Sequence, residues 1–339
     1  MNYKKILVIQ TAFLGDVILI TPLLRSLKNI YPGSHIDVLV IPQTSGVLEN
    51  NPNIRKIISL DKRKNKICSF FKALRELKKE NYDMAVSPHS SITNAMLMLF
   101  AKIPRRIGFD RRLARLFLTD KVPHENNILK ISKNLQLLSI FSDEKFNIQT
   151  ELFPSSDMFL KADGLLSELK LQNSKTIAIS PGSVWFTKRW PQKYYKTLIN
   201  FLTSMNFKVV LIGSKNERTL CEEVKSEINC INLAGTLSVL ESAAVISKCD
   251  LAITNDSGVL HIANAVKTDV LSFFGPTVKN IGYSPFREND IVIEIDLDCR
   301  PCGSHGGKKC PLGHHNCMRN ITPDYVLTII LKNLNGTYK

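Results

Sequence analysis

Short apolar runs alternate with amphipathic stretches along the first half of the chain. The strand-like runs are 5–10, 35–41 and 83–88. The stretches with apolar residues at helical spacing are 19–29, 69–79 and 92–103. Strands that alternate with helices in this way predict a parallel sheet with crossover helices.

The same alternation returns in the second half. Most of its strand-like runs are continuously apolar, as expected of strands covered on both faces. They are 175–183, 208–214, 230–235, 250–258, 269–277 and 290–295. With 339 residues the chain exceeds the size at which one core keeps growing. We therefore expect an α/β protein of two doubly wound domains, residues 1–153 and 154–322, which face each other across a cleft.

A polar segment around Pro154 forms the expected linker between the two domains. The chain closes with an amphipathic helix at about 323–339, which begins with a Thr-Pro pair. We expect this helix to pack back onto the first domain.

The chain is strongly basic, with 45 Lys and Arg against 30 Asp and Glu and a formal charge of +15. Such a charge predicts attraction to a polyanion. The basic residues concentrate at 55–79 and 102–121, where Leu, Ile and Phe recur at roughly helical spacing. No nucleic-acid-binding motif accompanies them, so the pattern favours an anionic membrane surface over nucleic acid. An ordinary solvated helix face is the alternative.

Segments that target or anchor a protein are not evident in the sequence. It has no run of eighteen apolar residues, and Lys4 and Lys5 lead directly into a strand, unlike the start of a signal peptide. We expect a cytoplasmic protein. The eight cysteines are then expected to stay reduced.

An aspartate stands where the first strand gives way to a helix, in "KILVIQTAFLGDVILITPLLRSLKN". Gly15 supplies the conformational freedom of the loop, and Asp16 follows it. Two interpretations are open. Asp16 caps the helix, or it is a chemically active carboxylate at the carboxyl end of a parallel strand.

A strand, a small polar turn and a helix follow one another in "DLAITNDSGVLHIANAV". The free amides of the first helical turn make this an anion site, and Ser257 and Gly258 allow a diphosphate to approach the backbone. Asp256 either caps the helix or binds a sugar hydroxyl. His261 lies one turn further on, and a buried core histidine is the alternative for it.

A second loop, in "AISPGSVWFTKRWP", carries Lys188. A lysine there can meet the charge that develops on a leaving diphosphate, whereas ordinary surface charge is the alternative. The loops in "LIGSKNE" and "LAGTLSV" add small residues at the same edge of the predicted sheet. Together these loops outline a nucleotide site.

Seven segments, in order along the chain, resemble the heptosyltransferases of glycosyltransferase family 9, most closely the ADP-heptose:lipopolysaccharide heptosyltransferase II type. They are "ILVIQTAFLGDVILITPLLRSL", "HSSITNAMLMLFAKIPRRIGF", "ISPGSVWFTKRWP", "LIGS", "LAGTLSVLESAAVI", "TNDSGVLHIANAV" and "FFGPT". The resemblance implies the GT-B fold of two facing Rossmann-like domains with an interdomain cleft. It implies inverting transfer of heptose from ADP-L-glycero-D-manno-heptose to the inner core of lipid-A-linked lipopolysaccharide, with no cofactor. It also implies a peripheral location at the cytoplasmic face of the inner membrane.

The resemblance also assigns roles to individual residues. Asp16 matches the family's proposed general base, and Lys188 matches the lysine that contacts the donor phosphates. The donor-binding positions are Ser180, Gly182, Ser183, Lys188, Gly213, Glu217, Leu237, Asp256, Ser257, Gly258, Val259 and His261. The acceptor-binding positions are Gly15, His89, Ser90, Arg105 and Arg106. Val259 stands where related sequences often have Pro or Leu, a change that leaves the backbone role intact.

A cysteine cluster, "CRPCGSHGGKKCPLGHHNC", lies outside these roles. Cys299, Cys302, Cys310 and Cys317 could ligate zinc, yet their spacings do not form the usual pair of C-x2-C knuckles. We therefore predict no metal, with reduced cysteines packed in a long loop.

Two rival functions stay open at this point. One is a family 9 enzyme with another acceptor or nucleotide sugar. The other is a non-catalytic nucleotide- or metal-binding protein, against which the presence of both Asp16 and Lys188 argues.

Overall fold

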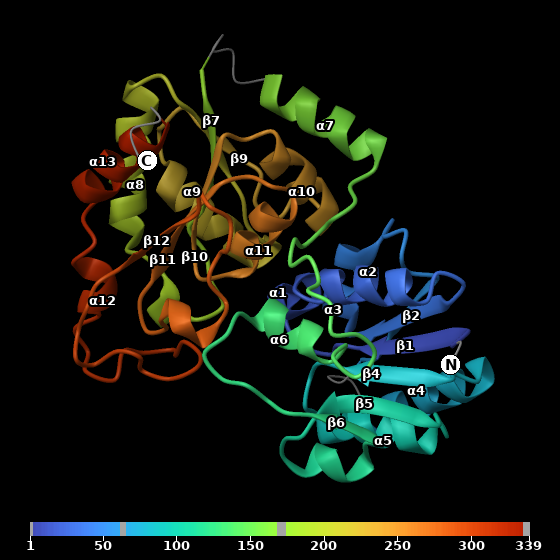
Figure 1. Cartoon of the computed structure of the whole chain (residues 1–339). Helices are drawn as coiled ribbons and strands as arrows, with labels where there is room; N and C mark the ends of the chain where they lie inside the picture. The colour runs from blue at the N-terminus through green and yellow to red at the C-terminus, as the bar shows by residue number, and fades with distance from the viewer. Residues whose placement is uncertain (1–2, 62–65, 168–173, 335–339) are drawn as a thin grey trace. The chain divides into compact units, whose positions relative to one another are not determined.

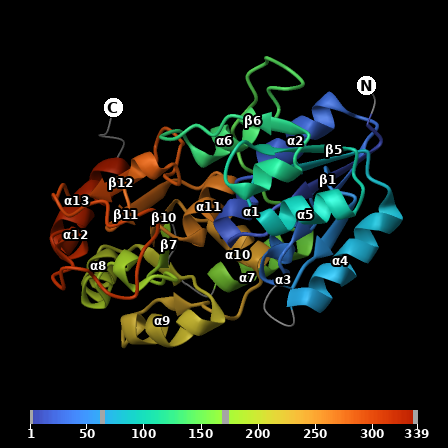
Figure 2. The same cartoon turned by 90° about the horizontal axis from the view of Figure 1, so that it is seen from below.

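The computed structural model describes residues 3–61, 66–167 and 174–334 (Figure 1). The chain forms two compact units, Met1–Phe153 and Pro154–Lys339. Each unit contains a six-stranded sheet in which every strand pair is parallel. Helices flank the strands of each unit (Figure 1, Figure 2). The two units are those of the α/β GT-B fold that the sequence predicts.

The first sheet has the order β3-β2-β1-β4-β5-β6. Its strands are β1 Lys5–Ile9, β2 His35–Val40, β3 Lys56–Ser59, β4 Met84–Ser87, β5 Arg105–Phe109 and β6 Asp120–Val122. Its α-helices are α1 Leu14–Ile18, α2 Thr21–Ile30, α3 Pro42–Ser45, α4 Lys66–Glu80, α5 Ile92–Phe100 and α6 Lys130–Gln136. The described part of this unit also contains the 3₁₀ helices η1 Gly46–Leu48 and η2 Leu113–Phe117.

The second sheet has the order β12-β11-β10-β7-β8-β9. Its strands are β7 Thr176–Ser180, β8 Lys208–Leu211, β9 Ile231–Asn232, β10 Leu251–Asn255, β11 Val270–Phe274 and β12 Ile291–Glu294. Its α-helices are α7 Ser156–Ser167, α8 Gln192–Ser204, α9 Arg218–Lys225, α10 Val239–Ser247, α11 Gly258–Ala265, α12 Asn316–Arg319 and α13 Pro323–Leu334. The 3₁₀ helices are η3 Phe186–Lys188, η4 Lys215–Glu217 and η5 Lys279–Ile281.

Both sheets share one topology. Numbered within its own unit, each has the strand order 3-2-1-4-5-6 of a Rossmann fold. The order reverses between β1 and β4 in the first sheet and between β7 and β10 in the second. Ligands of such sheets bind at the carboxyl ends of the strands on either side of this reversal, so these four strands mark the regions to examine.

The basic segments of the first half contain strands that the sequence pattern did not predict. The segment 55–79 includes β3 before α4, and 102–121 includes β5 and the start of β6. The predicted helix at 19–29 corresponds to α2, which begins at Thr21 with Pro22 in its first turn, and a separate short helix, α1, precedes it and ends at Ile18. Proline lacks the amide that a continuous helix needs at that point.

The closing helix packs within the second unit. Val326, Ile329 and Ile330 of α13 belong to the buried core of that unit, and the helix contacts α8. The expectation that this helix returns to the first unit is therefore wrong for its buried face. Residues 335–339 of the predicted helix lie outside the described residues.

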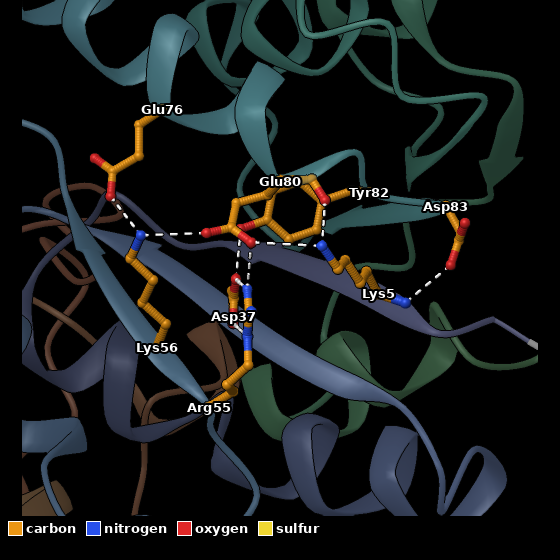
Figure 3. A network of polar contacts seen from close by, with 8 residues as sticks. All are labelled: Lys5, Asp37, Arg55, Lys56, Glu76, Glu80, Tyr82 and Asp83. Carbon is orange, nitrogen blue, oxygen red and sulfur yellow. Dashed lines mark hydrogen bonds and ion pairs between the residues drawn. The ribbon is translucent and has the colours of Figure 1, made fainter.

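A network of charged and polar side chains lies at the amino-terminal edge of the first sheet (Figure 3). Asp37 of β2 is fully buried, and it accepts hydrogen bonds from Arg55 Nε at 2.9 Å and from the Tyr82 hydroxyl at 2.6 Å. Arg55 also bonds Glu80 at 2.6 Å, and this contact lowers the pKa of Glu80. Burial and the hydrogen bond to Asp37 raise the pKa of Tyr82. The buried carboxylate is therefore compensated, as its stability requires.

Within the described residues, no helix combines the length and the hydropathy needed to cross a bilayer.

Replacing Tyr82 by Phe tests the weight of this network. The substitution removes a hydrogen bond to a buried charge, so we expect the free energy of unfolding to fall by about 1.5–3 kcal/mol. Urea denaturation measures the change, and its slope should stay constant. Tyr325→Phe, at a tyrosine that is 52% exposed on α13, is the matched control and should change little. Equal losses in the two variants would remove the special role of Tyr82.

Candidate active site

The predicted donor-binding residues gather at the carboxyl edge of the second sheet. Because the strands are parallel, the loops that follow them emerge at one edge. Ser180, Gly182 and Ser183 end or follow β7, Gly213 and Glu217 follow β8, Leu237 follows β9, and Asp256, Ser257, Gly258, Val259 and His261 follow β10. The two loops nearest the strand-order reversal are those after β7 and β10.

A lysine and an aspartate from these two loops form a buried ion pair. Lys188 Nζ lies 2.5 Å from Asp256 Oδ2, and the two side chains are 13% and 8% exposed. The Thr277 hydroxyl, after β11, donates to the same carboxylate oxygen at 2.7 Å. Lys188 is therefore not ordinary surface charge. The N-cap of α11 is Ser257, so the capping interpretation of Asp256 is also wrong.

One buried asparagine ties the loops together. Asn255 Oδ1 accepts from the Trp190 amide at 2.8 Å and from the Tyr195 hydroxyl at 3.1 Å. Its Nδ2 donates to the carbonyls of Pro181 and Gly182, both at 3.0 Å. Asn255 is the residue before Asp256, so these bonds fix the Lys188 loop relative to its partner carboxylate. Sequence reasoning missed Asn255, because its four partners lie far from it along the chain.

Gly182 is required by a close approach to Glu217. A Cβ at position 182 would overlap the Glu217 carboxylate. That carboxylate accepts hydrogen bonds from both the amide and the hydroxyl of Ser214, each at 2.8 Å. A side chain at position 182 would therefore require the Glu217 side chain to move away from its hydrogen bonds to Ser214.

His261 is a buried residue of α11, only 5% exposed, and its ring lies edge-on to Tyr283 at 6.3 Å. Val259 lies in the first turn of the same helix and is partly exposed. The first turn, rather than His261, is therefore the accessible part of this helix.

The cysteine-containing loop packs against the loop that carries Lys188. The Thr187 hydroxyl accepts from the Gly307 amide at 2.7 Å, and His315 Nε2 lies 2.8 Å from the Thr187 carbonyl. A Cβ on Gly306 would lie 2.6 Å from that of Trp185. The two loops are therefore closely packed, and a change in one displaces the other.

The cysteines of that loop border a cavity of about 90 Å³. Cys302, Cys310 and Cys317 line it, and burial raises the pKa of Cys317 to about 11. Across 3–61, 66–167 and 174–334, no group of three or more Cys, His, Asp or Glu side chains is placed to hold a metal ion.

In the first unit, Asp16 lies in the first turn of α1. The N-cap of this helix is Phe13, and Gly15 is buried. Asp16 is the third residue of the helix, three positions after the N-cap, so it is not the N-cap residue. His89 and Ser90 follow β4, and Asp16 follows β1. These are the two strands on either side of the strand-order reversal.

Arg105 and Arg106 do not join this group, contrary to expectation. They begin β5 and therefore lie at the amino-terminal edge, opposite to the edge of Asp16. Arg105 pairs with Asp120 at 2.8 Å and donates to the Tyr3 hydroxyl at 2.6 Å. Arg106 donates to the carbonyls of Phe117 and Ile103. Both guanidinium groups stabilise the sheet, so we no longer expect either arginine to bind the acceptor.

A different set of basic residues follows the carboxyl ends of β5 and β6. Arg111 comes after β5, His124 comes after β6, and Arg111 Nη1 lies 2.9 Å from His124 Nε2. Lys130 and Lys133 lie on α6, with Lys133 only 8% exposed. Sequence reasoning missed this set, although the two strands that precede Arg111 and His124 would have located it.

The charges of this set affect the pKa values of neighbouring members, and Lys130 also interacts with Asp16. Burial lowers the pKa of Lys130, whereas the nearby Asp16 carboxylate raises it. Burial, then Arg111, lower the pKa of Lys133. Asn134 of the same helix donates to the Leu19 carbonyl at 2.9 Å, which fixes α6 against the end of α1. Partly desolvated cations held beside one carboxylate form a surface suited to an anionic ligand.

Two Rossmann-like units, one with a buried lysine at the carboxyl edge of its sheet and the other with a carboxylate at the corresponding edge of its own sheet, are typical of nucleotide-sugar glycosyltransferases. The sequence profile described as "Glycosyltransferase family 9 (heptosyltransferase)" matches residues 70–312, well over half of the chain. The protein belongs to this family and is a glycosyltransferase.

Individual relatives extend this similarity to nearly the whole chain. The chain is 28% identical over 343 residues to lipooligosaccharide heptosyltransferase 2 of Campylobacter jejuni, with 97% of this chain and 98% of the relative covered. Its fold is similar to the structure of Escherichia coli ADP-heptose lps heptosyltransferase II, with a TM-score of 0.81, 24% identity, and 99% and 100% of the chains covered. A family 9 glycosyltransferase from Veillonella parvula superposes with a TM-score of 0.85 at 24% identity, over 99% and 98% of the chains.

Replacing Asn255 by Ala tests its role in joining the loops. Each buried group left unpaired costs roughly 1–3 kcal/mol, so the free energy of unfolding should fall by at least about 2 kcal/mol. Amide hydrogen exchange in residues 181–190 should accelerate more than in α10. Asn200→Ala, at an exposed position of α8, is the control. Unchanged exchange in 181–190 would show that Asn255 does not hold the loop.

Proposed function

We propose that the protein transfers heptose from ADP-L-glycero-D-manno-heptose to the inner core of lipid-A-linked lipopolysaccharide. The observation that carries the proposal is the match to heptosyltransferases 2 over nearly their full length, together with the Lys188–Asp256 pair in the expected donor loops. In this assignment the first unit binds the acceptor and the second unit binds the nucleotide sugar.

The donor diphosphate is assigned to the carboxyl edge of the second sheet. The amides of the first turn of α11 point toward that edge and attract an anion, as at other helix N-termini. Lys188 supplies the positive charge, and it neutralises the diphosphate as the bond to the sugar breaks. Asp256 holds the lysine in place before the donor arrives, and the hydroxyl of Thr277 orients Asp256.

The base of the reaction is assigned to Asp16. Inverting transfer needs one group that takes the proton of the acceptor hydroxyl while its oxygen attacks the anomeric carbon from the face opposite to the diphosphate. A carboxylate in the first turn of a helix at the carboxyl edge of a sheet fits this role. His89 and Ser90, which follow the neighbouring strand, are assigned to the acceptor sugar together with Gly15.

The anionic groups of the acceptor are assigned to Arg111, Lys130 and Lys133. Charged hydrogen bonds to phosphate or carboxylate would offset the mutual repulsion of these cations. His124 has a pKa lowered by burial and by the surrounding cations, so its neutral ring accepts a hydrogen bond from Arg111 and orients that side chain.

The protein is further proposed to act as a peripheral protein at the cytoplasmic face of the inner membrane. The excess of basic residues supports this location, because anionic lipid attracts them. Lys62, Arg63 and Lys64 belong to the basic segment from which this location was predicted, and they lie outside the described residues.

Replacing Asp16 by Asn tests both the activity and the base. ADP release is measured with ADP-heptose and a panel of truncated lipopolysaccharides. The unaltered protein should prefer an inner-core acceptor, and Asp16→Asn should lower turnover by roughly 10²-fold or more with little change in donor KM. Asp143→Asn, an exposed aspartate of the same unit, should retain turnover. Activity only with another sugar or acceptor would overturn the proposed substrate, whereas full turnover of the Asp16→Asn protein would overturn the base.

The pH dependence of the acceptor KM tests the role of Lys130. Because burial lowers the pKa of Lys130, its charge is lost below the usual lysine range as pH rises. The KM of a soluble, delipidated acceptor should therefore increase with pH on the alkaline side. Lys130→Arg keeps the charge and should reduce this increase, while Lys145→Arg, at an exposed site, should not. An identical pH profile for all three proteins would exclude Lys130 from the acceptor site.

A further inference from the structure

The 3₁₀ helix η2 exposes two leucines on one side. Leu113 is 64% exposed and Leu116 is 68% exposed. Residues three apart eclipse each other in a 3₁₀ helix, so these two side chains leave the helix in the same direction. Ala114 is buried in the core of the first unit, and Phe117 packs against the same core. The helix is therefore anchored by one side while the leucines remain in solvent.

Arginines surround the two leucines. Arg112 and Arg115 are exposed, as is Arg111 at the start of the segment. Asp110 pairs with Arg115 at 3.2 Å across an open surface, where such a pair stabilises little. The sequence Asp-Arg-Arg-Leu-Ala-Arg-Leu-Phe thus presents an apolar pair within a net positive charge.

Single exposed leucines are common and need no explanation. Leu160 of α7 is 69% exposed and Leu312 is 64% exposed. Leu160 has one adjacent cation, Lys161, which pairs with Glu241, and Leu312 has none. The combination in η2 is different, because apolar side chains and cations leave together from a helix that is fixed to the core. This is the chemistry that an anionic lipid surface binds, with apolar groups at the acyl boundary and cations at the phosphates.

We propose that η2 docks the protein on an anionic membrane, with Leu113 and Leu116 entering the headgroup region and Arg112 and Arg115 binding lipid phosphates. This inference rests on the proposed function, which requires a lipid-linked acceptor. Arg111 connects the two, because it begins the docking segment and also contacts His124 of the acceptor-side set. Docking through η2 therefore brings the cations beside Asp16 close to the headgroup layer that carries the acceptor.

The first experiment removes the apolar pair. Leu113→Gln with Leu116→Gln should lower binding to vesicles of phosphatidylcholine and phosphatidylglycerol by at least about tenfold, since each buried leucine contributes more than a tenfold factor. The same number of exposed leucines is changed in the control, Leu160→Gln with Leu312→Gln, which should bind as the unaltered protein does. Turnover on a soluble, delipidated acceptor should stay the same in both proteins.

The second experiment removes the charge and is independent of the first. Arg112 has a φ of 55° and a ψ of −166°, a backbone conformation that glycine adopts most readily, so Arg112→Gly with Arg115→Gln removes both charges without adding backbone strain. This protein should lose its preference for anionic over phosphatidylcholine vesicles and the salt dependence of binding.

The outcomes separate docking from the proposed function. Equal binding of the unaltered protein to neutral and anionic vesicles at low salt would overturn the inference. An equal loss of vesicle binding in the control protein, Leu160→Gln with Leu312→Gln, would also overturn it. So would a protein partner that binds through η2 when the protein does not bind vesicles. If η2 binds anionic vesicles as expected but no heptose is transferred to any acceptor, docking stands and the proposed function fails.

Discussion

The single direction of the strands in each sheet is the constraint on which the other features of this protein depend. A parallel strand cannot be followed by a tight turn into its neighbour, so each connection crosses over, and every loop after a strand emerges at the carboxyl edge. Lys188 and Asp256 are 68 positions apart in the chain, yet their side chains lie 2.5 Å from each other. Local sequence interactions do not produce such a pair. It follows from strand order, which makes β7 and β10 neighbours.

The two edges of the first sheet treat charge in opposite ways. At the amino-terminal edge, Asp37, Arg55 and Glu80 satisfy one another, as do Arg105 and Asp120. At the carboxyl edge, burial and the neighbouring Arg111 lower the pKa of Lys133, which means that its charged form is destabilised in the folded protein. Charges that neutralise one another stabilise a fold, whereas cations held together are stabilised when an anion binds. The first arrangement is structural, and the second is suited to recognition.

Residues outside the predicted donor-binding set fix the loops of the candidate donor site. Asn255 joins the loops after β7 and β10, and the cysteine-containing loop packs on Thr187. Arg300, whose side chain is 4% exposed, donates to the carbonyls of Phe274 and Thr277 and so fixes the loop that supplies Thr277. Preorganised positions of this kind matter because a charged group contributes to catalysis only when its geometry is fixed in advance.

Local patterns in the sequence were enough to predict the fold class, most strands and helices, and the family. Buried parallel strands are almost uniformly apolar, and the loops after them carry glycine and polar residues, so both signals are local and readable. Asp16, Lys188 and the turn at Asp256 were located in this way. The same local reading failed for β5, because two arginines at its start conceal a strand of five residues.

The contacts of each charged residue depend instead on the three-dimensional arrangement. Arg105 and Arg106 looked like acceptor ligands from their place in a family-like segment, but the direction of β5 puts them at the opposite edge, where Asp120 and backbone carbonyls bind them. Arg111, only five residues beyond Arg106, passes to the carboxyl edge and meets His124 and the lysines of α6. Sequence spacing fixes neither outcome, because charge partners are set by distances in space, and these depend on strand order and direction.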